Sequence, residues 1–163
     1  MERLRTERLT LRPLTESDVD DLRRLHADPD VMRFLDPAPV GHYLAGGFHA
    51  AVERRTGRWL GWFELGDTGA GVFELGYRLR RDCWGRGYAT EGAGALVEHA
   101  FRARGAQRVV ATTMAVNAGS RRVMRKCGLR YVRTVFPQWD EPLPGAEHGD
   151  VEYELTRQEW ESA

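Results

Sequence analysis

A glycine-rich turn in the middle of the chain has the residue types of an anion site. Gly85, Arg86 and Gly87 stand between a strand-like segment and a helix-like segment. Glycine permits a tight turn that brings successive backbone N–H groups toward one point, where the following helix also leaves its first amides unpaired. The positive end of the helix dipole adds to the attraction for phosphate. The turn therefore predicts a phosphate site, with a purely structural turn as the alternative.

Two common nucleotide motifs do not fit this turn. A Rossmann fingerprint would need glycine at position 90, where the chain has Thr90. A P-loop would need Gly-Lys followed by Ser or Thr, and the sequence has no such run. The remaining candidate is a pyrophosphate-containing ligand that is bound by neither of these two motifs.

Composition limits the partners of such a site. The 24 basic and 24 acidic residues cancel, so no global field favours nucleic acid or an anionic membrane. No apolar stretch approaches the ~18 residues of a membrane span, and the N-terminus shows no apolar signal segment. Cys83 and Cys127 lack the spacing of a metal site or a disulfide framework. We expect a cytoplasmic protein that binds no metal, nucleic acid or membrane.

Hydrophobic spacing predicts the elements that position the turn. Strands are expected over residues 8–14, 59–65, 72–79, 109–115, 129–136 and 151–155. Helices are expected after Thr15, over residues 30–55, from the glycine turn to Gly105, and from Asn117 to Cys127. The helix over 30–55 is weak because glycines interrupt it. The length and the absence of a linker predict one mixed α and β domain over residues 1–163.

Four pieces of sequence, in this order, resemble the Gcn5-related N-acetyltransferase (GNAT) superfamily. Within it they are most similar to the branch of ribosomal-protein N-terminal acetyltransferase-like enzymes. The pieces are LTLRPL at 9–14, ELGYRL at 74–79, WGRGYATE at 84–91, and NAGSRRV at 117–123 followed by KCGL at 126–129. Together they span most of the chain.

The resemblance implies the GNAT fold, which is α+β. About seven strands would form a mixed, mostly antiparallel sheet that splays open between its fourth and fifth strands, with about four helices. Acetyl-coenzyme A (acetyl-CoA) would lie in the gap, its pyrophosphate on the turn and its pantetheine arm along the edge of the preceding strand. The implied cofactor-binding residues are Arg78, Leu79, Arg80, Trp84, Gly85, Arg86, Gly87, Tyr88, Ala89, Thr90, Asn117 and Ser120.

The implied reaction is acetyl transfer to a primary amine, on a protein N-terminus or a small molecule, by direct attack in a ternary complex. A lysine-like ammonium with a pKa of ~10.4 must first lose a proton, which costs roughly 4.6 kcal/mol at pH 7. Glu74 is the candidate base, because strand alternation points it away from Phe73 and Leu75. The alternatives are water and the loop carboxylates Asp140, Glu141, Glu147 and Asp150.

Two positions depart from the wider superfamily. Asp82 stands where Arg or Gln is frequent, and Met124 stands where a tyrosine often protonates the leaving thiolate. Methionine cannot donate a proton, so the resemblance leaves Ser120 as the candidate donor, with water as the alternative. Cys83 precedes a helix, a position that could lower its thiol pKa.

A non-catalytic acyl-CoA-binding module on the same fold is the alternative to an enzyme, because a fold does not fix a function. Glu74 and Ser120 favour the enzyme. The resemblance also implies that residues 30–55 line the acceptor site, but their sequence does not identify the acceptor. The sequence is compatible with a homodimer.

Overall fold

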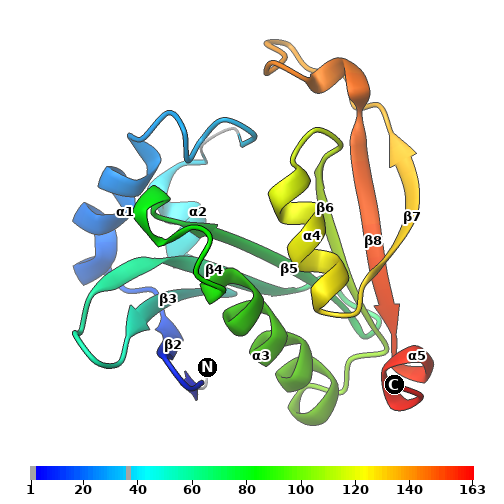
Figure 1. Ribbon diagram of the computed structural model, residues 1–163, viewed down its shortest axis with the longest axis horizontal. Coiled ribbons are helices and arrows are strands. Elements are labelled where there is room, and N and C mark those ends of the chain that lie inside the picture. Colours follow the sequence, from blue (N-terminus) through cyan, green and yellow to red (C-terminus); the bar gives the residue numbers. More distant parts are fainter. Residues whose placement is uncertain (1–2, 36–37) are drawn as a thin grey trace.

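The computed structural model describes residues 3–35 and 38–163, and its described strands form one twisted sheet (Figure 1). The strand order across the sheet is β1-β2-β3-β4-β5-β6-β8-β7. Neighbours run antiparallel except β5 and β6, which are parallel. The strands are β1 (Leu4–Arg5), β2 (Leu9–Pro13), β3 (Phe48–Glu53), β4 (Trp59–Asp67), β5 (Val72–Leu79), β6 (Arg108–Met114), β7 (Arg130–Val135) and β8 (Asp150–Thr156).

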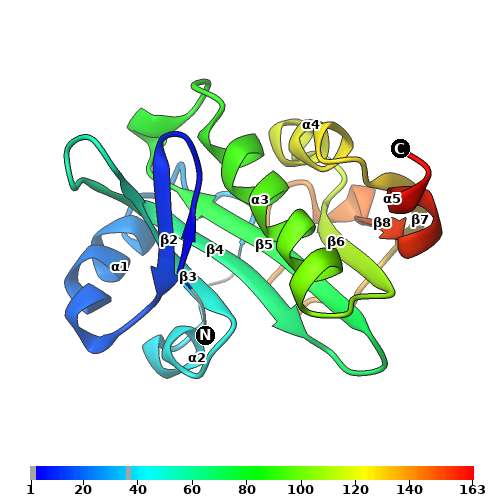
Figure 2. The same cartoon turned by 90° about the horizontal axis from the view of Figure 1, so that it is seen from below.

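Helices cover both faces of this sheet (Figure 2). One face carries α3 (Tyr88–Ala103) and α4 (Ala118–Lys126), and the other carries α1 (Val19–His26) and α2 (Val40–Leu44). The short α5 (Arg157–Glu161) follows β8, and single 3-10 turns occupy Glu16–Asp18, Arg81–Cys83 and Ala146–His148. None of the helices in the described ranges is both long and apolar enough to span a membrane.

Each face has its own hydrophobic cluster. Leu9, Leu11 and Phe63 are fully buried in the cluster on the face that carries α3 and α4. Trp59 and Trp62 of β4 point the other way and are buried with the apolar residues of α1 and α2. The alternation of side chains along a strand therefore divides the core between the two helix layers.

The predicted helix over residues 30–55 is wrong in its second half. Only Val40–Leu44 is α-helical, and Phe48–Glu53 is the strand β3, which pairs with β2 and β4. The run from Phe48 to Ala51 is buried at every position, so it lacks the alternation that marks a half-exposed strand. Part of the predicted helix, residues 36–37, lies outside the described residues. The other predicted helices and strands are confirmed to within a few residues.

The sheet opens between β5 and β6. Parallel pairing joins only Val72–Glu74 with Arg108–Val110. Beyond Glu74, β5 remains paired with β4 as far as Leu79, whereas β6 continues along β8. Figure 1 shows the two strands diverging. Counted from β2, this is the predicted gap between the fourth and fifth strands of a GNAT fold.

Candidate active site

A cavity of about 510 Å³ lies at this divergence. Its walls come from the end of β5, the glycine turn, the N-terminal half of α3, the helix α4 and the segment after α1. Of the twelve predicted cofactor residues, ten line it: Arg78, Leu79, Trp84, Gly85, Gly87, Tyr88, Ala89, Thr90, Asn117 and Ser120. The fold thus brings the end of β5, the turn and α4 around one space.

The turn has the conformation that its glycines predict. Gly85 and Gly87 have φ angles of +73° and +82°, in the left-handed region that favours glycine. Gly87 is the N-cap of α3, and the helix begins at Tyr88. The first amides of a helix have no partner within it, and Tyr88, Ala89 and Thr90 all line the cavity. The arrangement is suited to an anion.

Arg8 contacts the glycine turn on the side away from the cavity lining. Its Nε lies 2.7 Å from Glu91 Oε1 in the first turn of α3, and its Nη1 donates to the carbonyl of Arg86 at 2.9 Å. The guanidinium carbon also lies 4.1 Å from the centroid of the Tyr88 ring. The start of the chain therefore stabilises the turn that faces the cavity.

Two hydroxyl groups meet where β5 faces α4. Tyr77 Oη lies 2.9 Å from both Ser120 Oγ and the Ser120 carbonyl. Burial raises the pKa of Tyr77 to about 12, so its hydroxyl keeps its proton at neutral pH. Asn117 is the N-cap of α4, and its Oδ1 accepts from the Ser120 amide at 3.2 Å. Met124, also on α4, is buried in the core and does not line the cavity.

Two predicted cofactor residues do not line the cavity. The side chain of Arg80 lies 3.3 Å from Asp82 in an ion pair, and Asp82 also pairs with Arg58. Arg86 is exposed, and its carbonyl accepts from Arg8. Asp82, the first departure from the superfamily pattern, is thus bound to arginines outside the cavity.

Comparison with known proteins agrees with this geometry. The family model described as "Acetyltransferase (GNAT) domain" matches residues 8–130. This chain belongs to the GNAT acetyltransferase family. The family and the ribosomal-protein acetyltransferase-like branch predicted from the motifs are confirmed.

The GNAT relatives include both sequences and solved structures. An "FsC-acetyl coenzyme A-N(2)-transacetylase" from Aspergillus fumigatus is 34% identical over 181 residues, covering 96% of this chain and 77% of the relative. A GNAT acetyltransferase structure from Bacillus anthracis superposes with a TM-score of 0.82 at 20% identity, covering 96% of this chain and 99% of the other. A spermidine N-acetyltransferase from Vibrio cholerae, solved with CoA and spermine, superposes with a TM-score of 0.79 at 14% identity, covering 95% and 99%.

Glu74, the candidate base of this GNAT chain, is exposed on β5. It points away from the buried Phe73 and Leu75, as the alternation predicts. It stands at the last paired position between β5 and β6, opposite Val110, but it does not line the cavity. Its role in catalysis stays a prediction.

The alternative carboxylates lie in and after the loop before β8. Asp140, Glu141 and Glu147 are exposed, and Glu147 Oε1 lies 3.6 Å from His148 Nε2. Asp150 begins β8, and burial raises its pKa. None of these four lines the cavity.

Sequence analysis missed Glu64, which lies across from β5 on β4. Its partner in the β4–β5 register is Gly76. Burial, and secondarily the charge of Glu74, raise the pKa of Glu64 to about 7. The sequence of β4 indicates a core strand, and no local pattern marks one glutamate within it as unusual.

Neither cysteine has the lowered thiol pKa that favours a nucleophile. Cys83 is buried, and burial together with the adjacent Asp82 raises its thiol pKa to about 11, so the lowered pKa expected from its position is wrong. Burial also raises the pKa of Cys127 to about 11. Within residues 3–35 and 38–163, no group of three or more His, Cys, Asp or Glu side chains could hold a metal ion.

Proposed function

We propose that this GNAT enzyme transfers the acetyl group of acetyl-CoA to a primary amine, on a small molecule or a protein N-terminus, by direct attack in a ternary complex. One observation carries the proposal: a single cavity joins the glycine turn, the unpaired end of β5 and the Tyr77–Ser120 hydroxyl pair. Solved relatives hold CoA, which supports acetyl-CoA as the donor.

In this proposal the pyrophosphate binds the amides of the turn and of the first residues of α3. Arg122 and Lys126 line the cavity from α4 and add positive charge for the phosphates. The pantetheine amides pair with the backbone of β5 beyond Glu74, where β6 no longer occupies the strand edge. Trp84 donates its indole N–H to the carbonyl of Leu79 at 3.0 Å, which fixes the end of that edge.

The thioester then lies near Ser120, whose hydroxyl donates a hydrogen bond to the departing thiolate. A thiol has a pKa of ~8.5, so a thiolate near neutral pH needs only modest assistance. Tyr77 contacts the Ser120 hydroxyl and holds it at the cavity. This pair compensates for the absence of a tyrosine at position 124.

The acceptor enters between the unpaired part of β5 and the segment after α1, where Val31 and Phe34 line the cavity. One relative is named as an FsC-acetyl coenzyme A-N(2)-transacetylase, and one structural relative was solved with spermine. These names support amine acceptors as a class.

Free-thiol release from acetyl-CoA across an amine panel tests this function. The panel contains FsC, spermine and a peptide with an N-terminal serine, and a reaction without amine is the control. We expect one of these amines to release thiol and to gain an acetyl group in equal amounts, identified by mass spectrometry. Acetyl-CoA binding without release by any amine would instead indicate the non-catalytic acyl-CoA-binding module.

A further inference from the structure

We propose that Glu64, rather than Glu74, is the general base that takes the proton from the attacking amine. This assignment rests on the acetyl transfer proposed above. It follows from the position of the Glu64 carboxylate against the backbone of β5, just past the point where β6 separates.

Two glycines make room for this carboxylate. A Cβ atom on Gly76 would lie 2.9 Å from Glu64 Oε1, and a Cβ on Gly66 would lie 3.3 Å from Glu64 Oε2. The carboxylate therefore occupies the space that a side chain at position 76 would fill. Gly76 lies two residues beyond Glu74, the last residue of β5 that pairs with β6, so the Glu64 carboxylate lies over the first unpaired part of β5, although Glu64, like Glu74, is not among the residues that line the cavity.

The two faces of β5 present different chemistry at this point. Tyr77 points toward α4, where it meets Ser120. Glu64 and Arg78 lie on the opposite face, with Trp62 and the residues of α1 and α2. In this proposal an acetyl group in the gap has hydroxyl donors for the departing sulfur on one side and a carboxylate on the other, so the amine adds to the face of the carbonyl carbon that lies toward Glu64.

Glu64 has no ion-pair partner among the neighbours that the structure describes. Glu74 on β5 and Tyr43 on α2 interact with its charge, Arg78 lies on the same face of β5 opposite Trp62, and the partner of Glu64 on β3 is the apolar Phe48. Arg78 donates instead to the carbonyl of Val31 at 3.2 Å. Within the described ranges, no residue forms a hydrogen bond or ion pair with the Glu64 carboxylate.

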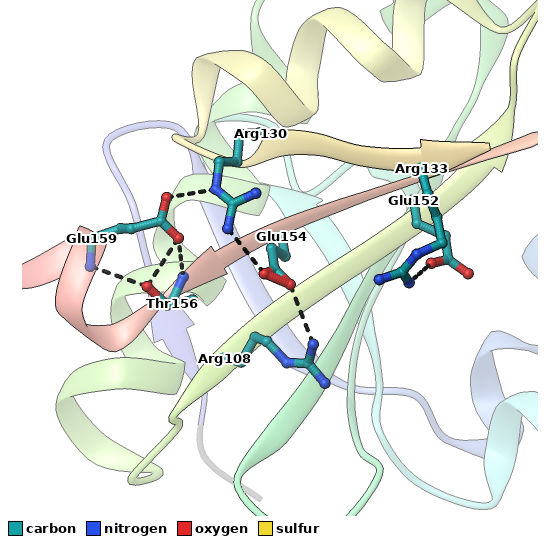
Figure 3. A network of polar contacts seen from close by, with 7 residues as sticks. All are labelled: Arg108, Arg130, Arg133, Glu152, Glu154, Thr156 and Glu159. Atoms are coloured by element: carbon teal, nitrogen blue, oxygen red, sulfur yellow. Dashed lines mark hydrogen bonds and ion pairs between the residues drawn. The ribbon is translucent and has the colours of Figure 1, made fainter.

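Glu152 and Glu154 of β8 are neutralised by arginines, unlike Glu64 (Figure 3). Glu154 of β8 lies 3.2 Å from both Arg108 and Arg130. Glu152 pairs with Arg133. Glu64 differs from these two glutamates because none of the described residues forms an ion pair with it, and from Glu74 because it is half-buried. These are the conditions that raise the pKa of Glu64 to about 7, where a base works best at neutral pH.

The proposed step conserves atoms and charge. The Glu64 carboxylate takes one proton from the ammonium of the acceptor. The neutral nitrogen then forms a bond to the acetyl carbon while the carbon–sulfur bond breaks, and a second proton moves from nitrogen to the departing sulfur. The products are the amide and CoA thiol, and Glu64 releases its proton to water.

Glu74 has a different part in this arrangement. It is exposed, and its negative charge adds to the effect of burial on Glu64. Removing that charge should lower the pKa of Glu64 without removing the base. Glu74 is therefore a positioning residue whose effect is electrostatic.

The pH profile of kcat/KM distinguishes the two glutamates. The substrates are acetyl-CoA and the amine of the panel that the wild type acetylates, and Glu98→Gln on the surface of α3 is the control. In the wild type, kcat/KM should decline as the pH falls below the pKa of Glu64. We expect Glu64→Gln to lower kcat/KM at pH 8 by roughly 10²–10⁴-fold and to abolish this decline. Glu74→Gln should keep that decline and shift its midpoint to lower pH. If Glu64→Gln keeps both rate and profile, or if Glu74→Gln is the variant that loses the decline, the assignment is wrong.

A weakly basic amine separates a base from a structural residue. With an amine that is already neutral at pH 7, such as an aromatic amine, the defect of Glu64→Gln should shrink at least tenfold, because no proton has to be removed before attack. A defect of equal size with both kinds of amine would overturn the proposal.

A titration that needs no acceptor tests the same residue independently of the proposed function. The ¹³C shift of the Glu64 carboxyl carbon, assigned by comparison with Glu64→Gln, should titrate with a midpoint near pH 7, and Glu74→Gln should lower it. A midpoint in the ordinary glutamate range, ~4.3, would exclude Glu64 as the base even if the enzyme proves active.

Discussion

At the scale of single residues, the alternation of side chains along β5 separates the two halves of the proposed reaction. Tyr77 reaches the leaving-group side through Ser120, and Gly76 leaves the acceptor side open to Glu64. Neither contact involves residues close in sequence. The consequence is that single substitutions should affect one half of the reaction and spare the other.

Ser120→Ala should lower kcat by roughly tenfold to a hundredfold, which corresponds to about 1.4–2.7 kcal/mol, with little change in the Kd of acetyl-CoA. The Ser120 hydroxyl bonds to Tyr77 and does not cap α4, so stability should change little. Asn117→Ala is the matched comparison: it removes the cap of α4 and should cost ~1 kcal/mol of unfolding free energy. Steady-state kinetics and urea unfolding of both variants check this. A fully active Ser120→Ala would remove Ser120 from the mechanism.

Glu64→Gln should stabilise the protein at pH 8 and have little effect near pH 4. The folded-state pKa of Glu64 is raised to about 7, above the ~4.3 of an unfolded glutamate. The wild type therefore loses stability as pH rises from about 4 to 7, and glutamine removes that loss. We expect a difference of about 1–2 kcal/mol, or roughly 2–8 °C in Tm, above pH 7. Thermal unfolding across pH measures it, and a pH-independent difference would contradict the raised pKa.

The residues that sequence analysis missed owe their roles to neighbours on other elements of the fold. Tyr77 has the pattern of a core residue, and only the position of α4 brings Ser120 to its hydroxyl. Glu64 matters because glycines face it at positions 66 and 76. By contrast, the glycine turn was predictable, because positive φ angles at Gly85 and Gly87 are a local property of the chain.

At the scale of elements, the packing of α3 on β4 positions the turn relative to the sheet. Gly92 of α3 faces the ring of Phe63, and a Cβ there would lie 2.3 Å from its Cζ atom. The helix axis can therefore approach the sheet closely. This contact fixes the N-terminus of α3 beside the open edge of β5.

Gly92→Ala should destabilise the protein by about 1–3 kcal/mol, because Phe63 is fully buried and must shift to admit the methyl group. Gly94→Ala in the same helix is the matched control, since nothing lies within 4 Å of its Cβ position. It should stabilise the protein by up to ~1 kcal/mol through helix propensity. Urea unfolding compares the two variants. Equal effects would show that α3 does not pack as tightly as described.

The strand β3 shows where element prediction fails. Its sequence, FHAAVE, contains two alanines and has no alternation, because β3 lies between β2 and β4 and is buried on both faces. Both features favour a helix when the segment is considered alone. The hairpin of β4 and β5 and the strands β2, β6, β7 and β8 keep local signals and were predicted correctly, whereas the two-residue edge strand β1 was not predicted.

At the scale of the whole molecule, the divergence of β5 and β6 creates the site. Short parallel pairing over Val72–Glu74 is followed by separation, because β5 follows β4 and β6 follows β8. The order of motifs along the chain predicted this gap through the family resemblance. Local sequence alone could not, because the gap depends on strand pairing between distant segments.

The central claim is that acetyl-CoA lies in this gap with its pyrophosphate on the glycine turn. The most direct measurement is the Kd of acetyl-CoA, by calorimetry, for the wild type and for Gly87→Val, with circular dichroism confirming that the variant is folded. Valine is strained at a φ of +82° and would obstruct the approach of the phosphate to the backbone. We predict at least a tenfold weaker Kd. An unchanged Kd in a folded Gly87→Val variant would contradict the assignment.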